Sequence, residues 1–437
     1  HHPFSIMSLY IPVIWPEQRH AWRSSMRCLR VRLLSFLVLT AVTYGQSPYN
    51  SALHGIILDR GAAASVGYGG VGLVSAHSSW FSFENPSTWA NLTFTLLSAH
   101  YNTGEVQYGG SESRAGFGRL ANASFIIPIR GKYALGLGVA PLSRKQFSIV
   151  DSSAASVIFA DDTLGMAKSL IGSGGISSFF IGGTWRFNET NSFGLNLDFL
   201  FGTFDDSTTA LLPVSFLSGY YHNEYPYYRR HSEYRGTMAS LYFTSSQRKE
   251  RLKSTFYLGL KVPVGESKVV RTDYFPYVDS EKQSPEEFPL PVTVMGGIAR
   301  HLTGNLHLGV EYQGRYFKEK EDYVLNSLTG SFGDASRLSV GLLRERIIGS
   351  RDFFDLLHYR IGFYRRQHYI FRAEDALIER GLSVGLGIPF GLTQNQIDFG
   401  FQFSSRKGFL TDNPEIIRQF TIGLTIGDIW LVKRRRR

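Results

Sequence analysis

The sequence predicts an all-β fold, a 14-stranded antiparallel transmembrane β-barrel with an N-terminal hatch inside the lumen. Three observations support this prediction. Fourteen segments alternate apolar and polar residues, as an extended strand with two different faces requires. Short turns alternate with longer loops between these segments, which is the layout of membrane barrels. The chain also contains 14% aromatic residues and 45 glycines, a composition that disfavours long helices.

The N-terminal part of the chain has the pattern of a secretory leader. We expect residues 1–25 to be an upstream read-through or a fragment, because a leader pattern begins only at Met26. A basic stretch, about ten apolar residues and small exit residues over 26–45 predict a secretory signal peptide cleaved before Gln46. The alternative, an anchor helix, would need about twenty apolar residues. The only cysteine, Cys28, lies in this leader, so the mature chain has no Cys nucleophile or Cys-based zinc site.

Residues 46–91 lack the alternation of apolar and polar residues that is typical of strands. Short apolar pieces divided by Gly and Ser predict a compact hatch, which a barrel of fourteen strands is wide enough to hold. A loose periplasmic extension is the alternative.

Residues 92–432 form the predicted barrel. The expected strands are 92–101, 116–129, 132–146, 174–187, 192–205, 234–246, 254–272, 290–302, 305–319, 335–347, 357–370, 378–390, 396–406 and 417–431. The longer connections, expected to be loops, are 147–173, 206–233, 273–289 and 320–334.

The faces of these strands predict which side meets lipid. In QIDFGFQFS (396–404) the phenylalanines share one face and Asp398 lies on the other. A soluble sandwich would need its polar faces rich in Lys, Glu and Thr, whereas here they are mostly Gly, Ser, Ala, Asn and Asp. Small residues with a few charges, such as Glu311 and Arg360, suit a crowded lumen. The apolar face, with Trp185 and Trp430 near strand ends, suits a lipid band with an aromatic girdle.

The stretch VGYGGVGLVSAHSSWFSFENPSTWANL, just before the first strand, resembles the hatch of the outer-membrane long-chain fatty acid and hydrophobic compound transporters (FadL/TodX-like barrels). Asn85 and Pro86 match that family's Asn-Pro-Ala motif, whereas Ser87 departs from it. The resemblance implies that Asn85, Pro86, Trp80, Phe81 and Phe83 form the hatch and contact ligand. The basic ending LVKRRRR departs from the family, and with the Gly-rich hatch it also resembles the shuttle barrels of the type IX secretion system.

ALGLGVAPLS (134–143) resembles the third strand of the same transporters, which is kinked and opens a gap in the wall. Gly136, Gly138 and Pro141 are the residues that would form a lateral gate, because Pro removes a ladder donor and Gly marks bends. Ordinary accommodation of barrel curvature is the alternative.

A tyrosine-rich and arginine-rich stretch (215–236) is a candidate extracellular capture loop. Tyr227, Tyr228, Arg229 and Arg230 would collect a carboxylated amphiphile through amphipathic rings and guanidinium groups. The alternative is a solvent-exposed loop that contacts lipopolysaccharide or covers the rim.

The remaining chemistry is sparse. Histidines such as His301 and His368 lie outside any recognisable Ser motif, so we expect no enzyme and no catalytic residues. Paired acids in loops are more often solvated than Ca²⁺ ligands, so no metal and no cofactor are expected. The basic tail (433–437) is expected in the periplasm, where anionic headgroups or a periplasmic protein, and not nucleic acid, would meet it.

The sequence therefore predicts a monomeric channel of the bacterial outer membrane for passive uptake of hydrophobic compounds such as long-chain fatty acids. Its partners would be a hydrophobic small molecule, outer-membrane lipid and lipopolysaccharide. The alternative is a non-transporting shuttle or scaffold barrel that binds periplasmic or secreted proteins. A general diffusion porin is a third reading, against which a folded hatch argues.

Overall fold

The computed structural model describes most of the chain. The described residues are 47–52, 55–58, 60–74, 80–108, 114–129, 131–159, 162–211, 224–249, 252–275, 278–318, 322–325, 328–372, 374–391, 394–409 and 413–428. The upstream residues (1–25), the predicted signal peptide (26–45), Trp430 and the basic tail (433–437) lie outside them.

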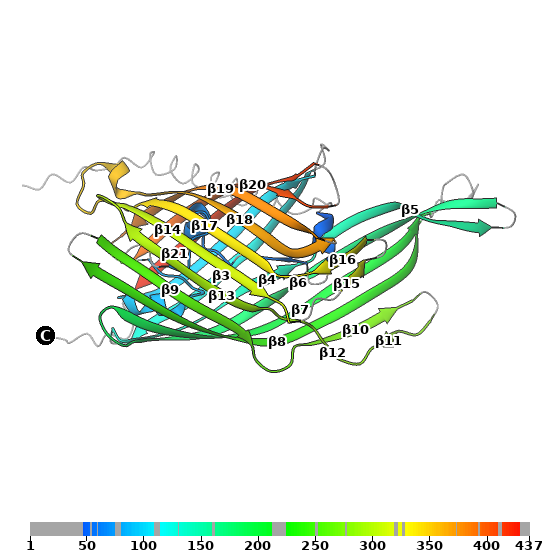
Figure 1. The fold of residues 1–437 in the computed structure, drawn as a ribbon, viewed down its shortest axis with the longest axis horizontal. Helices are drawn as coiled ribbons and strands as arrows, with labels where there is room; N and C mark the ends of the chain where they lie inside the picture. Colours follow the sequence, from blue (N-terminus) through cyan, green and yellow to red (C-terminus); the bar gives the residue numbers. More distant parts are fainter. Residues whose placement is uncertain are drawn as a thin grey trace, which may run out of the picture. The chain divides into compact units, whose positions relative to one another are not determined.

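Fourteen long strands pair antiparallel in a closed ring (Figure 1), and each overlaps one of the fourteen predicted segments. The ring closes where β2 pairs with β21, from Thr95 opposite Asp428 to Gln107 opposite Ile416. The strands are β2 (Thr95–Gln107), β3 (Arg114–Ile129), β4 (Tyr133–Arg144), β6 (Asp162–Arg186), β7 (Asn191–Leu211), β8 (Glu224–Lys249), β9 (Leu252–Pro263), β13 (Val292–His301), β14 (Leu306–Tyr316), β17 (Ala335–Arg344), β18 (His358–Arg372), β19 (Asp375–Phe390), β20 (Asn395–Lys407) and β21 (Glu415–Asp428).

The two faces of the strands differ as predicted. On β7, Leu195 and Phe201 are about half exposed on the outer face, at 53% and 49%, while Asp198 on the inner face is 0% exposed. Strand β19 repeats this, with Leu382 exposed and Ser383 buried. A closed barrel with an apolar outer surface is suited to lipid, so the protein belongs in the bacterial outer membrane.

The long connections differ from the prediction. Residues 147–173 and 206–233 were expected to be loops, but β5 (Phe147–Phe159) pairs with β6, and β7 pairs with β8 as far as Leu211 opposite Glu224. These strands run well beyond the barrel wall (Figure 1). Their residues carry no alternation of apolar and polar types because they extend past the lipid, so the periodicity that revealed the other strands is missing.

The predicted strand 254–272 is divided in two. Strand β9 ends at Pro263, Gly265 adopts a φ of 72°, and β10 (Lys268–Tyr274) resumes pairing with β8. Four minor strands complete the sheet: β11 (Glu281–Lys282), β12 (Glu286–Glu287), β15 (Asp322–Leu325) and β16 (Leu328–Phe332).

The described residues before β2 fold inside the ring. They form η1 (Pro48–Ser51), β1 (Ile56–Ile57), α2 (Ala63–Gly67) and η2 (Pro86–Asn91). We call residues 47–91 the N-terminal segment. Inward-facing glycines allow its backbone to approach the wall, since a Cβ on Gly362 would lie 2.3 Å from the nitrogen of Gly69. Among the described residues, no helix combines the length and the apolarity needed to cross a bilayer.

Candidate functional site

A buried ion pair joins the N-terminal segment to the barrel wall. Asp198 of β7 is 0% exposed and accepts hydrogen bonds from Arg60 Nη1 and Ser178 Oγ, each at 2.6 Å. Lys261 of β9 approaches the other carboxylate oxygen at 2.6 Å. Burial opposes the charge on Arg60, but attraction to Asp198 outweighs it, so the pKa of Arg60 is raised. One carboxylate therefore holds two buried cations, one from the segment and one from the wall.

A second carboxylate binds the backbone of the segment. Glu311 of β14 accepts hydrogen bonds from the N–H groups of Gly72, Leu73 and Val74, at 3.0, 2.7 and 2.6 Å. Successive backbone N–H groups that converge in this way form a nest suited to an anion. Glu311 thus fixes the conformation of residues 72–74 against β14.

Asn85 and Pro86 position η2. Asn85 caps the helix, because its Oδ1 accepts from Ser87 N at 3.1 Å, and its Nδ2 donates to Leu73 O at 2.8 Å. Pro86 occupies the first turn, where its missing N–H is no loss. Strand β7 holds the same helix, since Ser192 Oγ donates to Ser87 O at 2.7 Å. The structure places both predicted residues in the attachment of the segment to the wall.

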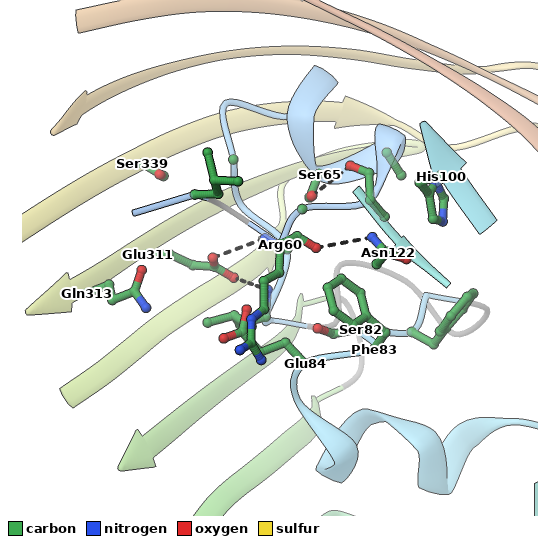
Figure 2. A pocket seen from close by; sticks show the side chains of 18 of the residues that line it. Arg60, Ser65, Ser82, Phe83, Glu84, His100, Asn122, Glu311, Gln313 and Ser339 are labelled. Carbon is green, nitrogen blue, oxygen red and sulfur yellow. Dashed lines mark hydrogen bonds between the residues drawn. The ribbon is translucent and has the colours of Figure 1, made fainter. Parts of the chain in front are cut away.

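Trp80, Phe81 and Phe83 line a large cavity inside the barrel. Figure 2 shows this cavity, with Arg60, Glu84 and Glu311 around it. Trp80 is 5% exposed and packs edge-on against Tyr68, with ring centroids 5.9 Å apart. Phe83 packs near Phe180 of β6. The predicted aromatic residues are thus both part of the core of the segment and part of the cavity wall.

The cavity has apolar and charged parts. Its apolar lining includes Leu142, Ile176, Met238, Phe288 and Leu290. Its basic lining residues, which outnumber the acidic Glu84, Glu311 and Asp398, are Arg60, Lys261, Arg315, Arg337, Arg346 and Arg360. A second cavity shares Ile57, Leu58, Gly61, Ser65 and Gly70 with the first. The N-terminal segment therefore faces both cavities.

The wall is interrupted between β3 and β4. Their pairing runs only from Ile129 opposite Tyr133 to Ala123 opposite Val139. Beyond this point, within the described residues, β3 pairs with β2 alone, and β4 pairs with β1 of the N-terminal segment. The N–H of Leu58 donates to Leu142 O at 2.9 Å. A short piece of the segment thus occupies the edge of β4 that β3 has left.

The three predicted gate residues lie along β4 near this interruption. Pro141 lies next to a register shift between β4 and β6. Gly136 and Gly138 lie in the regularly paired part, where a Cβ would come within 2.8 Å of the Trp89 ring and 2.6 Å of the Phe180 ring. These two glycines leave room for inward-facing aromatic rings.

The predicted capture residues lie on a strand and not in a loop. Tyr227, Tyr228, Arg229 and Arg230 belong to β8 where it extends beyond the barrel, and the side chain of Tyr227 lies outside the described part. Arg230 donates to both carboxylate oxygens of Asp273, at 2.8 and 3.0 Å, and Tyr228 donates to the same group. Arg229 pairs with Asp205 at 3.0 Å. Each arginine is already bound by an aspartate.

Sequence reasoning missed the charged residues of the wall that attach the segment. A lone charge on a small-residue face was the available signal for Asp198, Lys261 and Glu311, but nothing in the sequence indicated which part of the segment each would bind. Over the described residues, no group of three His, Cys, Asp or Glu side chains could hold a metal ion.

Comparison with known proteins shows a shared fold. The toluene transporter TbuX of Ralstonia pickettii is 15% identical, covering 84% of this chain and 97% of its own, with a TM-score of 0.51. TodX, the toluene transporter of Pseudomonas putida, is 14% identical, covering 86% and 99%, with a TM-score of 0.52. A FadL homologue of Pseudomonas aeruginosa is 12% identical, covering 85% and 99%, with a TM-score of 0.50.

The predicted resemblance to FadL/TodX-like barrels is confirmed at the level of the fold. No curated protein matches the sequence. The family model described as BamG matches residues 27–436. Since this match spans nearly the whole sequence, the chain belongs to the BamG family.

Proposed function

We propose that the chain is a channel for passive uptake of hydrophobic compounds across the outer membrane. The observation that carries the proposal is the position of the main cavity, whose lining includes Leu142 and Ser143 where β3 and β4 have separated. A ligand would enter the cavity from the outside, meet Trp80, Phe81 and Phe83, and leave sideways into the bilayer. The two toluene transporters that share the fold support this reading.

Long-chain fatty acids are the ligands we favour. An apolar chain suits the side of the cavity near Ile176, Met238 and Leu290, and a carboxylate suits the basic side. Arg315 is the residue we favour for it, because within the described residues the side-chain hydrogen bond of its guanidinium is a 3.4 Å contact with Gln313.

The N-terminal segment would act as the predicted hatch (46–91). Asn85 and Pro86 would hold it to the wall through η2, while β1 would be the part that leaves β4. Gly136, Gly138 and Pro141 would border the lateral gate. Capture by Tyr227, Tyr228, Arg229 and Arg230 would require the ligand carboxylate to displace an aspartate, which is easier at Arg229, 62% exposed, than at the doubly bonded Arg230.

The test is uptake of a labelled long-chain fatty acid by cells with and without this barrel. A variant carrying Ile57→Cys and Ser143→Cys, with Cys28→Ser, can lock β1 to β4, because directly opposed residues on paired strands have Cβ atoms close enough for a disulfide. We expect uptake to fall in the oxidised variant and to return after reduction, which serves as the matched control. Equal uptake in both states would show that transport does not require β1 to leave β4. No uptake by the unmodified barrel would contradict the proposal that it is a channel.

The alternative is a shuttle or scaffold barrel that binds periplasmic or secreted proteins. The observation in its favour is the sheet that β5, β6, β7, β8 and β10 extend beyond the barrel (Figure 1), because it offers surface that a channel for small molecules does not need. Purification of the barrel from outer membranes distinguishes the two: a stoichiometric protein partner favours the scaffold, and a bound lipid-like molecule favours the channel.

The predicted signal peptide (26–45), the basic tail (433–437), contact with lipopolysaccharide and the monomeric state belong to the same proposal. All four presuppose that the chain is exported and inserted in the outer membrane, where the rim of the barrel contacts lipid.

A further inference from the structure

The connection between β17 and β18 exposes several large apolar side chains. Residues 345–357 contain η4 (Phe353–Leu356), the short helical turn drawn at the end of these two strands in Figure 1. Ile348 is 82% exposed, Phe354 66% and Phe353 61%. The two phenylalanine rings contact each other, with centroids 5.8 Å apart. Exposed apolar clusters of this kind mark contacts with membranes or proteins.

The connection is held in a defined conformation. The N–H of Ile347 donates to Asp355 O at 2.7 Å, and Ser350 Oγ donates to the Asp355 carboxylate at 3.1 Å. Asp352 caps η4 by accepting from the N–H of Phe354 at 3.0 Å. These bonds fix the backbone while the apolar side chains stay uncovered, so their exposure is built into the conformation.

Contacts with the wall place η4 on the outer flank of the barrel, whereas Arg346, near the start of the connection, lines the cavity. Leu338 and Leu342 alternate with buried residues on β17, and Arg344 continues their outward-facing row. Arg344 lies over the ring of Tyr359 on β18, 5.6 Å from its centroid, and Tyr359 belongs to the outward row of Ile361. Arg344 also pairs with Asp355 and donates to Phe354 O at 3.4 Å. Through this arginine, η4 is attached to the side of the wall that faces lipid.

We propose that residues 347–357 anchor this end of the barrel in the interface of the surrounding leaflet, with Ile348, Phe353 and Phe354 inserted at the boundary between headgroups and acyl chains. Apolar side chains next to polar ones, as in this connection, bind at that depth. The surface continues directly from the lipid-facing Leu342 and Ile361, which are paired neighbours. Tyr359 and Arg344 lie between η4 and this lipid-facing part of the wall, at the level where aromatic girdles occur. A lipid surface is therefore the occupant that these contacts favour over a protein.

Spin labelling of the full chain tests this placement. Cys28→Ser removes the only cysteine, and Phe354→Cys then provides a unique site for a nitroxide. The folded barrel is reconstituted in vesicles of phosphatidylethanolamine and phosphatidylglycerol. The accessibility of the label to oxygen, which concentrates in lipid, is compared with its accessibility to a water-soluble nickel chelate. Leu342→Cys is the lipid-facing reference, and Glu189→Cys, in an exposed turn, is the aqueous control.

We expect the ratio of oxygen to nickel accessibility at Phe354→Cys to be several-fold above that at Glu189→Cys and to approach that at Leu342→Cys. A ratio equal to that of the aqueous control would overturn the proposal. Protection from both reagents, in the vesicles or in outer-membrane fragments from cells, would also overturn it, because a protein or a second copy would then cover the site. The measurement does not depend on uptake, so it stands whether or not the barrel is a channel.

Discussion

The N-terminal segment is attached to the barrel in two very different ways. On the side of β7, β9 and β14 it is held by buried charges: Asp198 binds Arg60 and Lys261, and Glu311 binds three backbone N–H groups. On the side of β4 it is held by β1, a strand of two residues, and by apolar packing of Trp89. Breaking a buried ion pair is far more costly than breaking a short ladder. We therefore expect β1 to separate from β4 before the buried ion pair breaks.

Asp198→Asn should have the largest effect on stability. It leaves Arg60 and Lys261 buried without the carboxylate that both of them bind, and breaking a buried pair costs about 3–5 kcal/mol. Urea unfolding of the barrel in detergent measures the loss. The matched control is Asp205→Asn on the same strand, whose partner Arg229 is mostly exposed, with an expected change of about 0–1 kcal/mol. Equal losses in the two variants would contradict the comparison.

Glu311→Gln should have an intermediate effect. The substitution keeps the shape of the side chain but replaces a charge-assisted acceptor, and hydrogen bonds to charged groups contribute about 1.5–3 kcal/mol. We also expect faster protease cleavage within residues 46–91, because 72–74 lose their fixed conformation. Unchanged cleavage would show that the Gly72–Val74 nest does not hold the segment.

Leu58→Pro should have a smaller effect on stability. Proline removes the N–H that donates to Leu142 O, a loss of about 0.5–1.5 kcal/mol. Exchange of the amide hydrogens of β4 near Ser143 should nevertheless become faster, while those of β7 keep their protection. Hydrogen exchange read by mass spectrometry checks both strands in one experiment. Faster exchange at β7 would mean that the segment moves as one body.

Acid should produce the smallest effect, at the extension of β8 and β10. Hydrogen bonds from Arg230 hold the pKa of Asp273 below its ordinary value. A depressed pKa stabilises the folded state above the ordinary pKa, and this contribution is lost as the pH falls through the folded-state value. Below about pH 4, β10 should therefore lose hydrogen-exchange protection while the barrel strands keep theirs. The Asp273→Asn variant, which cannot titrate, should show no such pH dependence.

The sequence predicted the parts of the fold that are in contact with lipid. Alternation located every barrel strand, because one face must be apolar where it meets acyl chains, as Leu195 and Phe201 do. It failed at Arg229 and Arg230, where β8 has left the lipid and neither face needs to be apolar. The site was harder to predict. Arg60 and Asp198 are 138 residues apart, and no local pattern records which lumenal charge a distant segment will meet.

The closure of the ring also fixes an order of events. One edge of the first barrel strand, β2, pairs with β3, and its other edge pairs with the last strand, β21, so the ring cannot shut before β21 has been delivered. The N-terminal segment is made before either strand and ends up enclosed by both. We therefore expect it to lie inside the forming ring when β2 pairs with β21. In this order of assembly, the barrel closes around the N-terminal segment.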